Sequence, residues 1–310
     1  MTLYRDLPLL PGLSMPHAWD EFGPDDQLGT INRLTPQRVA AALRNVPFGR
    51  TINLTLPLDV PNPPMFGRKA YRHNIHQLSR NEQDDFVDGF HLQASSQWDG
   101  LRHVRAKEFG FYGRRGAGQT GPEGHELGIE KWAERGIIGR GVLLDVASFA
   151  AANGAPIDPF SDTPIPVEQL EATAAWERVV IQPGDILLIR TGWMAAYLSL
   201  DAEQRIAAAV AERWAGLRGD SAMAEFLWDH EIAAVAADNP AVEDSPGDPI
   251  AGSLHRRLIP LLGFALGELW ALDGLAKYAA GIGRWDCCVI SVPLNLPGGV
   301  GSPANAIAVV

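Results

Sequence analysis

The chain has 310 residues, a length that fits two average domains or one large α/β or all-β domain. It carries 26 Lys and Arg against 37 Asp and Glu, and a formal net charge of −11 argues against nucleic acid or an anionic membrane surface as a partner. No apolar run reaches the roughly 18 residues that a membrane span requires, and the first residues do not resemble a signal peptide. We therefore expect a cytoplasmic protein that binds neither nucleic acid nor membranes.

The two cysteines, Cys287 and Cys288, are adjacent in a run with strand-like composition. Successive side chains of a strand point to opposite faces, so this pair suits neither a disulfide nor a metal site. We expect both to be small residues of the core.

The first half of the chain contains one clear helix and a long polar segment. Thr35 is a suitable N-cap and Pro36 suits the first helical position, ahead of the apolar run VAAALRNV. Residues 51–60 favour a strand, which the prolines of PNPP at 61–64 must end. Residues 65–90 are polar without periodicity, which predicts a loop that covers the surface or a site.

The second half alternates between strand-like and helix-like segments. The expected strands are residues 140–149, 184–193, 231–238, 286–296 and 304–310, and the expected helices are 167–179, 201–217, 222–230, 253–262 and 266–279. Apolar runs such as VLLDV and ILLI do not alternate with polar residues, which is typical of strands covered on both faces. The sequence therefore predicts one α/β domain over 51–310, with a mixed sheet flanked by helices and with residues 1–50 packed on it as an N-terminal arm and helix.

Charged residues inside two of these apolar runs should have buried partners. Asp145 lies within VLLDVAS and Arg190 within LLIRTGW. A buried charge is costly unless it is paired, so we expect each of them to have a partner in the core.

The densest cluster of chemically useful side chains is HLQASSQWDGLRH at residues 91–103. If residues 91–99 form an extended strand, one face presents His91, Gln93, Ser95, Gln97 and Asp99. Trp98 and its alternate neighbours then face the packed side, and Gly100 ends the strand and lets His103 fold back.

Geometry limits what a straight strand could do here. At roughly 3.3 Å per residue, Gln97 and Asp99 can meet one ion, whereas Gln93 lies about 13 Å from Gln97 and needs a bulge or strong curvature to join them. A polar strand held by hydrogen bonds near the surface is the alternative, because glutamine is an uncommon metal ligand.

Two further acid–base candidates lie in the second half. His255 begins the segment HRRLIPLLGFALGE, and Glu268 ends it on what is predicted to be the next helix. Gly263 allows a break between them, so the two side chains could meet in one cleft; the alternative is that both are solvated surface residues.

Two common catalytic or cofactor-binding motifs can be excluded. GAGQTG at 116–121 matches G-x-G-x-x-G, but it follows no apolar strand and meets Pro122 instead of a helix, so we exclude a dinucleotide loop. The chain has no G-x-S-x-G elbow, which argues against a serine hydrolase.

These residues resemble the cyclase-type metal-dependent hydrolases, which include bacterial kynurenine formamidase, isatin hydrolase and trans-dienelactone hydrolase. The usual signature of that family is H-x-G-T-H-x-D-x-x-x-H, and residues 93–103 read Q-A-S-S-Q-W-D-G-L-R-H when aligned on Asp99 and His103. Gln93 and Gln97 stand where the first two histidines would be. This pattern is most similar to the trans-dienelactone hydrolase branch.

The resemblance covers nearly the whole chain. It includes DDQLGTIN (25–32), GIIGRGVLLDVA (136–147), PGDILLIRTGW (183–193), AADNPAVE (236–243), LHRRLIPLLGFALGELW (254–270) and SVPLNLPGGVGSPANAIAV (291–309). It implies a swivelling β/β/α-type fold, a divalent metal ion such as Zn²⁺ or Mn²⁺, and a homodimer or homotetramer. It also implies that Gln93, Gln97, Asp99, His255 and Glu268 form the metal and substrate site.

The expected chemistry is hydrolysis of a small cyclic ester or amide, with a metal-activated water attacking the carbonyl. Asp99 and His103 are the expected catalytic residues, and a reference pKa near 6.5 suits His103 as the general acid and base. The expected substrate contacts are Trp98 and the loop over 65–90, with Arg72, His73 and His76 available to meet a substrate carboxylate.

Two other functions remain open at this point. A cyclase, dehydratase or isomerase would use Asp99 and His103 as an acid–base pair and would turn over in the presence of a strong chelator. A binding protein that keeps only the fold would bind its ligand without turnover and without metal.

Overall fold

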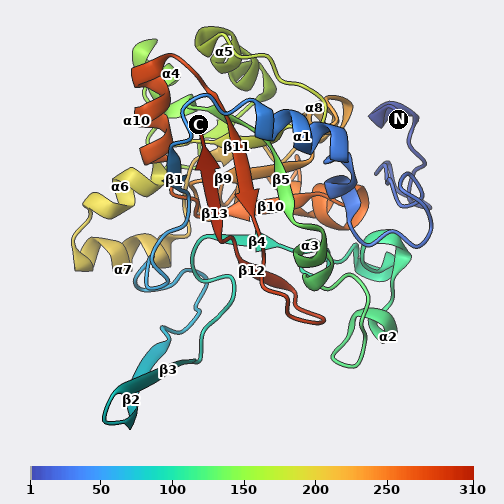
Figure 1. Cartoon of the computed structure of the whole chain (residues 1–310). Helices are drawn as coiled ribbons and strands as arrows, with labels where there is room; N and C mark the ends of the chain where they lie inside the picture. The colour runs from blue at the N-terminus through green and yellow to red at the C-terminus, as the bar shows by residue number, and fades with distance from the viewer. Residues whose placement is uncertain (1) are drawn as a thin grey trace.

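A computed structural model describes residues 2–310, and in this part of the chain nine strands form one mixed sheet (Figure 1). The strand order is β1-β13-β11-β5-β7-β9-β10-β4-β12. The bounds are β1 Thr51–Asn53, β4 Gln97–Asp99, β5 Ile137–Leu144, β7 Ile186–Ile189, β9 Ala234–Ala237, β10 Ala265–Glu268, β11 Asp286–Ser291, β12 Gly301–Pro303 and β13 Ala306–Val309.

The centre of the sheet is parallel and its two edges are antiparallel. Strands β5, β7, β9 and β10 run parallel, and all other neighbouring pairs are antiparallel. The run VLLDV at the end of β5 and all of β7 (ILLI) are buried, which confirms that these apolar runs are covered on both faces. Every residue of β9 and β10 is buried as well. The expected mixed α/β fold is confirmed.

Helices surround this sheet (Figure 1). The helices of six or more residues are α1 Pro36–Arg44, α3 Glu130–Arg135, α4 Val146–Ala152, α5 Val167–Glu177, α6 Trp193–Ser199, α7 Ala202–Ala211, α8 Ser221–Asp229 and α10 Asp273–Ile282, and the short ones are α2 Ala117–Thr120 and α9 Leu254–Arg257. Helix α1 begins as predicted, because Thr35 Oγ1 accepts a hydrogen bond from the backbone N–H of Arg38 at 3.3 Å. No helix within residues 2–310 is long and apolar enough to cross a membrane.

The five strands predicted in the second half are present as β5, β7, β9, β11 and β13, with different ends. The chain leaves the sheet after Leu144 and Ile189 and then forms α4 and α6. These two helices were not predicted, because their first residues continue the apolar runs of the strands. The predicted helix over 201–217 is too long: α7 ends at Ala211, and Gly216–Leu217 form β8, which pairs with β6 (Pro164–Ile165).

The predicted helix over 266–279 is wrong at its start. Residues Ala265–Glu268 form β10, and the helix begins only at Asp273. Strand β10 lies between β9 and β4, and pairing with two neighbours outweighs the helix propensity of its Ala, Leu and Glu residues. The predicted helix over 253–262 is divided between α9 and a π-helical turn, Leu258–Leu262.

The prediction of a loop over 65–90 is correct in its surface position but wrong for residues 72–88. Strands β2 (Arg72–Ser79) and β3 (Glu82–Asp88) form a two-stranded hairpin that projects from the body of the molecule (Figure 1). Every hairpin strand residue except Asn74 is exposed. Because neither face is buried, the sequence lacks the alternation of apolar and polar residues that reveals most strands.

The buried charges have partners, as predicted. Arg190 Nη1 lies 2.7 Å from Asp145 Oδ1, and its Nε lies 2.7 Å from Asp273 Oδ1. Asp145 also caps α4 by accepting a hydrogen bond from the Ser148 N–H at 3.0 Å. Cys287 and Cys288 are buried free thiols in β11, which confirms the core assignment.

Glu177 at the end of α5 makes stability depend on pH. One of its oxygens accepts a hydrogen bond from the Asp145 N–H at 2.8 Å, and the other is buried without a partner. Burial, assisted by the charge of Asp145, raises the pKa of Glu177 to about 8. The folded protein then holds a proton that the unfolded chain releases near pH 4.5, so the stability from this group falls as pH rises from about 4.5 to about 8.

We expect Glu177→Gln to remove much of this fall, because glutamine resembles the protonated acid. At pH 8.5 the variant should gain roughly 3 kcal/mol relative to wild type, compared with pH 5.5, since the wild-type loss extends over the pH range from 5.5 to about 8 and each unit corresponds to about 1.4 kcal/mol. Urea unfolding of both proteins at the two pH values measures the difference. The matched control is Glu171→Gln on the exposed side of α5, and an equal gain there would contradict the assignment.

Candidate metal centre

Paired strands bring three polar side chains of the centre together. In the β4–β10 pair, Gln97 lies opposite Glu268 and Asp99 opposite Leu266. Residues two apart in a strand share a face, so Gln97, Asp99 and Glu268 point to the same side. Gln97 Nε2 donates to Glu268 Oε2 and lies 3.5 Å from Asp99 Oδ1.

Trp98 faces the opposite side of β4 and is completely buried. Its Nε1 donates to Ser291 Oγ at 2.8 Å, and its ring lies 4.9 Å from that of Trp270. Gly267 permits this packing, because a Cβ there would lie 2.7 Å from Trp270 Nε1. Trp98 is therefore a core residue that fixes β4 and β10, and the expectation that it forms a substrate wall is wrong.

A turn, and not a strand, brings Gln93 to the same place. Residues 92–96 form turns and bends, and only Gln97–Asp99 are extended, so the predicted strand over 91–99 is wrong in its first part. Serine side chains hold this turn: Ser95 Oγ donates to Pro57 O at 3.0 Å and Ser96 Oγ to Leu269 O at 2.5 Å. Gln93 Nε2 consequently donates to Asp99 Oδ1, so the turn supplies the curvature that a straight strand lacked.

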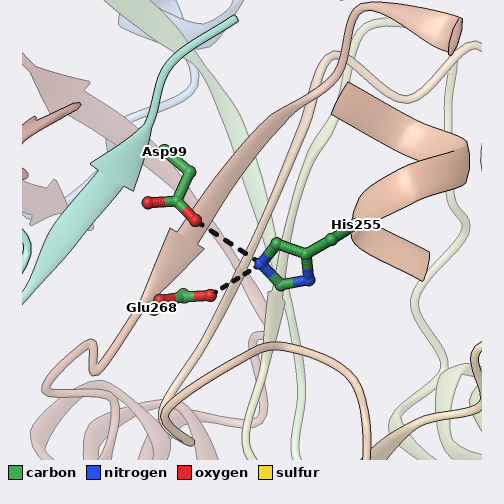
Figure 2. A group of neighbouring side chains, drawn as sticks. All are labelled: Asp99, His255 and Glu268. Carbon is green, nitrogen blue, oxygen red and sulfur yellow. Dashed lines mark hydrogen bonds and ion pairs between the residues drawn. The ribbon is translucent and has the colours of Figure 1, made fainter. Parts of the chain in front are cut away.

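His255 enters from the other side on α9 (Figure 2). Its Nε2 lies 2.9 Å from Glu268 Oε1 and 3.4 Å from Asp99 Oδ2. The predicted meeting of His255 and Glu268 is confirmed, although Glu268 lies on a strand.

Glu243 holds His255 in place, and sequence reasoning missed it. Glu243 Oε1 lies 2.9 Å from His255 Nδ1, and Glu243 also accepts hydrogen bonds from Ser253 Oγ and the Leu254 N–H. If Nδ1–H donates to Glu243, the lone pair of His255 Nε2 faces Asp99 and Glu268. Glu243 ends the segment AADNPAVE, but nothing in that segment marked it as a partner of His255.

The charges in this centre favour a cation. Burial and the charge of Asp99 raise the pKa of Glu268 to about 7. Burial also raises the pKa of Asp99, but the rings of His255 and His103 outweigh it and bring that pKa below its usual value. Burial lowers the pKa of His255, yet Asp99, Glu243 and Glu268 together raise it well above its usual value. Positive charge, as a proton or a metal ion, stabilises these buried carboxylates.

The donor set fits a divalent ion. One ligand atom each from Asp99, His255 and Glu268 lie within 4.8 Å of one another. Gln97 Oε1 is buried beside them and accepts no hydrogen bond from residues 2–310, and Asp99 Oδ2 has only the distant contacts with His255 Nε2 and His103 Nε2, at 3.4 and 3.5 Å, within those residues. Buried oxygens without partners are costly unless something absent from the chain itself satisfies them.

His103 lies at the exposed side of the centre. The backbone N–H of His103 donates to Gly100 O at 2.9 Å, which confirms that the chain folds back after the glycine. His103 Nδ1 lies 3.1 Å from Gln93 Nε2, and His103 Nε2 lies 3.5 Å from Asp99 Oδ2. The side chain is 30% exposed, compared with 14% for His255, 4% for Glu268 and 1% for Asp99, so solvent reaches His103 better than it reaches these three residues.

The other proposed substrate residues lie on the projecting hairpin. Arg72 and His73 pair across it with Asp88 and Asp85, at 3.5 and 2.5 Å. His76 packs its ring against Phe86 at 6.1 Å. No contact found among residues 2–310 joins these three side chains to Asp99, His255 or Glu268.

The fold and site define a class: an α/β protein with a buried carboxylate, amide and imidazole centre suited to a divalent ion. The family model for Cyclase matches residues 52–244. The chain belongs to the Cyclase family. No curated protein matches the chain significantly.

Several solved structures have a similar fold. A crystal structure described as a novel cyclase is 32% identical, with a TM-score of 0.84 over 95% of this chain and 99% of that one. Isatin hydrolase A from Labrenzia aggregata, bound to benzyl benzoate, is 18% identical, with a TM-score of 0.58 over 84% of this chain and 93% of that one. An isatin hydrolase bound to the product analogue thioisatinate is 17% identical, with a TM-score of 0.56 over 89% and 99%.

Proposed function

We propose that the protein is a metal-dependent hydrolase of a small cyclic ester or amide. The observation that carries this proposal is the set of two buried carboxylates and one imidazole whose ligand atoms converge, with Gln97 Oε1 buried beside them without a hydrogen bond from residues 2–310. Membership of the Cyclase family and the hydrolases among the similar folds support it. The Gln93, Gln97, Asp99 and His103 pattern, which resembles the trans-dienelactone hydrolase branch, favours a lactone.

Asp99, His255 and Glu268 would hold the ion, with Gln97 Oε1 and the Gln93 amide as neutral oxygen donors. A bound divalent ion supplies a Lewis acid that polarises a carbonyl and makes a neighbouring water more acidic. Carboxylate and amide oxygens are hard ligands, so Mn²⁺ suits this set as well as Zn²⁺ does.

The chain's own residues orient the reaction and move the proton. Asp99 lies between Gln93 and the two histidine rings, so it can keep the His103 ring turned toward the centre. His103, which is more exposed than Asp99 and His255, would take the proton of the attacking water at Nε2 and deliver it to the leaving oxygen or nitrogen. Glu243 would hold His255 in one tautomer by accepting its Nδ1–H.

The function can be tested by combining elemental analysis of the purified protein with a panel of lactones and cyclic amides. We expect about one divalent ion per chain and hydrolysis of at least one lactone. Turnover of the panel without any bound metal would contradict the proposal.

The Gln97→His variant should bind Zn²⁺ more tightly than wild type, because imidazole is a better zinc ligand than an amide oxygen. The change removes the Gln97 hydrogen bond to Glu268, so hydrolysis can fall even while affinity rises. Competition with a fluorescent zinc chelator measures the affinity. Gln77→His on the exposed hairpin is the control, and an unchanged or weaker affinity at position 97 would remove Gln97 from the ligand set.

Assembly into a homodimer or homotetramer remains a prediction from the family resemblance. Light scattering coupled to size-exclusion chromatography measures it.

A further inference from the structure

The segment that precedes the hairpin places an arginine beside the metal centre. Phe66 and Gly67 both adopt left-handed backbone conformations, with φ of 60° and 65°, and Met65 before them is buried. This conformation is uncommon for a residue such as phenylalanine, so the surrounding packing must hold the segment in place. The next residue, Arg68, is half-buried.

Arg68 is tied directly to the turn that carries Gln93. Arg68 Nη1 donates to Gln93 O at 2.5 Å, while the side chain of Gln93 bonds to Asp99 and to His103. The guanidinium also lies 5.1 Å from the Phe66 ring, which limits its freedom. Gln93 is therefore the one residue that lies between Arg68 and the proposed catalytic side chains of Asp99 and His103.

The positive charge of Arg68 therefore lies on the side of the centre that the Gln93 turn forms. His103, the proposed proton carrier, contacts the same turn, because its Nδ1 lies 3.1 Å from Gln93 Nε2. A substrate that reaches His103 consequently comes close to the guanidinium of Arg68.

Arg68 has unused hydrogen-bonding capacity. A guanidinium has five N–H donors, and the bond to Gln93 O is the one hydrogen bond found for it within residues 2–310. No Asp or Glu of those residues forms an ion pair with it. By contrast Arg72, four residues on, pairs with Asp88 and its side chain is 74% exposed.

We propose that Arg68 binds a carboxylate group of the substrate and makes the enzyme select anionic cyclic esters or amides over neutral ones. This inference rests on the proposed function. A guanidinium that lacks a carboxylate partner and borders a polar centre matches a carboxylate in charge and shape. Arg68 thus replaces Arg72, His73 and His76 as the residue that meets a substrate carboxylate.

The first test compares two γ-lactones that differ in one group, 5-oxotetrahydrofuran-3-carboxylate and its primary carboxamide. For wild type we expect a higher kcat/KM with the carboxylate. Arg68→Gln should lower kcat/KM for the carboxylate by about 10- to 100-fold, mainly through KM, and leave the carboxamide nearly unchanged. For the carboxylate, the kcat/KM of Arg68→Lys should lie between those of wild type and Arg68→Gln. Arg80→Gln at the hairpin turn should have the same kcat/KM as wild type.

An equal loss for both lactones would overturn the proposal, because it would mean that Arg68 only positions the Gln93 turn. Metal content and thermal midpoint of each variant show whether that turn is intact. Arg68→Lys keeps the positive charge, so it separates a folding defect from the loss of a carboxylate contact.

A binding measurement keeps this proposal separate from the proposed function. Calorimetry on the protein supplied with Mn²⁺ compares the dicarboxylates malonate, succinate and glutarate with the monocarboxylate butyrate, which can engage only one cation. We expect at least one dicarboxylate to bind about 10-fold or more tightly than butyrate, and Arg68→Gln to abolish that difference. If the difference holds while neither lactone is hydrolysed, the hydrolase assignment fails and the role of Arg68 stands. If no dicarboxylate is preferred, or the preference survives in Arg68→Gln, the role of Arg68 is wrong.

Discussion

Asp99→Ala is expected to abolish divalent metal binding and, with it, hydrolysis. Asp99 bonds to Gln93, and its carboxylate lies within 3.5 Å of the side chains of His103 and His255. Its removal takes away a buried negative charge and one of the three converging ligand atoms, so metal affinity should fall by more than about 100-fold, the upper end of what loss of an outer partner costs. Chelator competition and metal stoichiometry after dialysis measure this loss.

Asp99→Asn provides a second version of this test that preserves the shape of β4. Asparagine keeps one oxygen but removes the charge, so it should also lose the ion while the fold is retained. Asp88→Ala on the exposed hairpin is the control and should load metal normally. Stoichiometric metal in both Asp99 variants would show that the ion binds elsewhere.

His103→Ala should keep the fold and the metal while it lowers turnover by about 10²- to 10⁴-fold, the usual contribution of a positioned acid or base. His103 contacts Gln93 and Asp99 from the exposed side and lies outside the group of Asp99, His255 and Glu268 whose ligand atoms converge. The effect should fall on kcat more than on KM, since proton transfer occurs in the transition state. Steady-state kinetics with parallel metal analysis separates these outcomes.

The exposed His125→Ala serves as the matched control and should retain wild-type kinetics. A His103→Ala protein that loses its metal would place His103 among the ligands. One with near-normal kcat would make His103 a residue that only positions the Gln93 turn.

Local patterns predicted the parts of the fold and site that depend on nearby residues. Thr35 and Pro36 located the start of α1, and the spacing of Gln97 and Asp99 placed both side chains on one face of a strand. The glycine after Asp99 predicted the return of the chain that brings His103 back. Each of these depends on the backbone geometry of a few consecutive residues.

Features that depend on distant packing could not be predicted in this way. Glu268 lies on a strand because β9 and β4 pair with β10 on its two sides, which the helix-favouring run ALGE does not reveal. The turn at Gln93 depends on serine contacts to Pro57 and Leu269, far away in the chain. Glu243 and Arg68 become recognisable only from what they touch, His255 and the Gln93 carbonyl.

The most direct test of the account is hydrolysis by one preparation of the protein before chelation, after removal of metal, and after one equivalent of Mn²⁺ or Zn²⁺ is added back. We expect turnover of a lactone to disappear with the metal and to return with about one ion per chain. Full turnover by the metal-free protein would contradict a metal-dependent hydrolase and favour an acid–base isomerase or dehydratase. Ligand binding without turnover in any of the three states would instead indicate a binding protein built on the Cyclase fold.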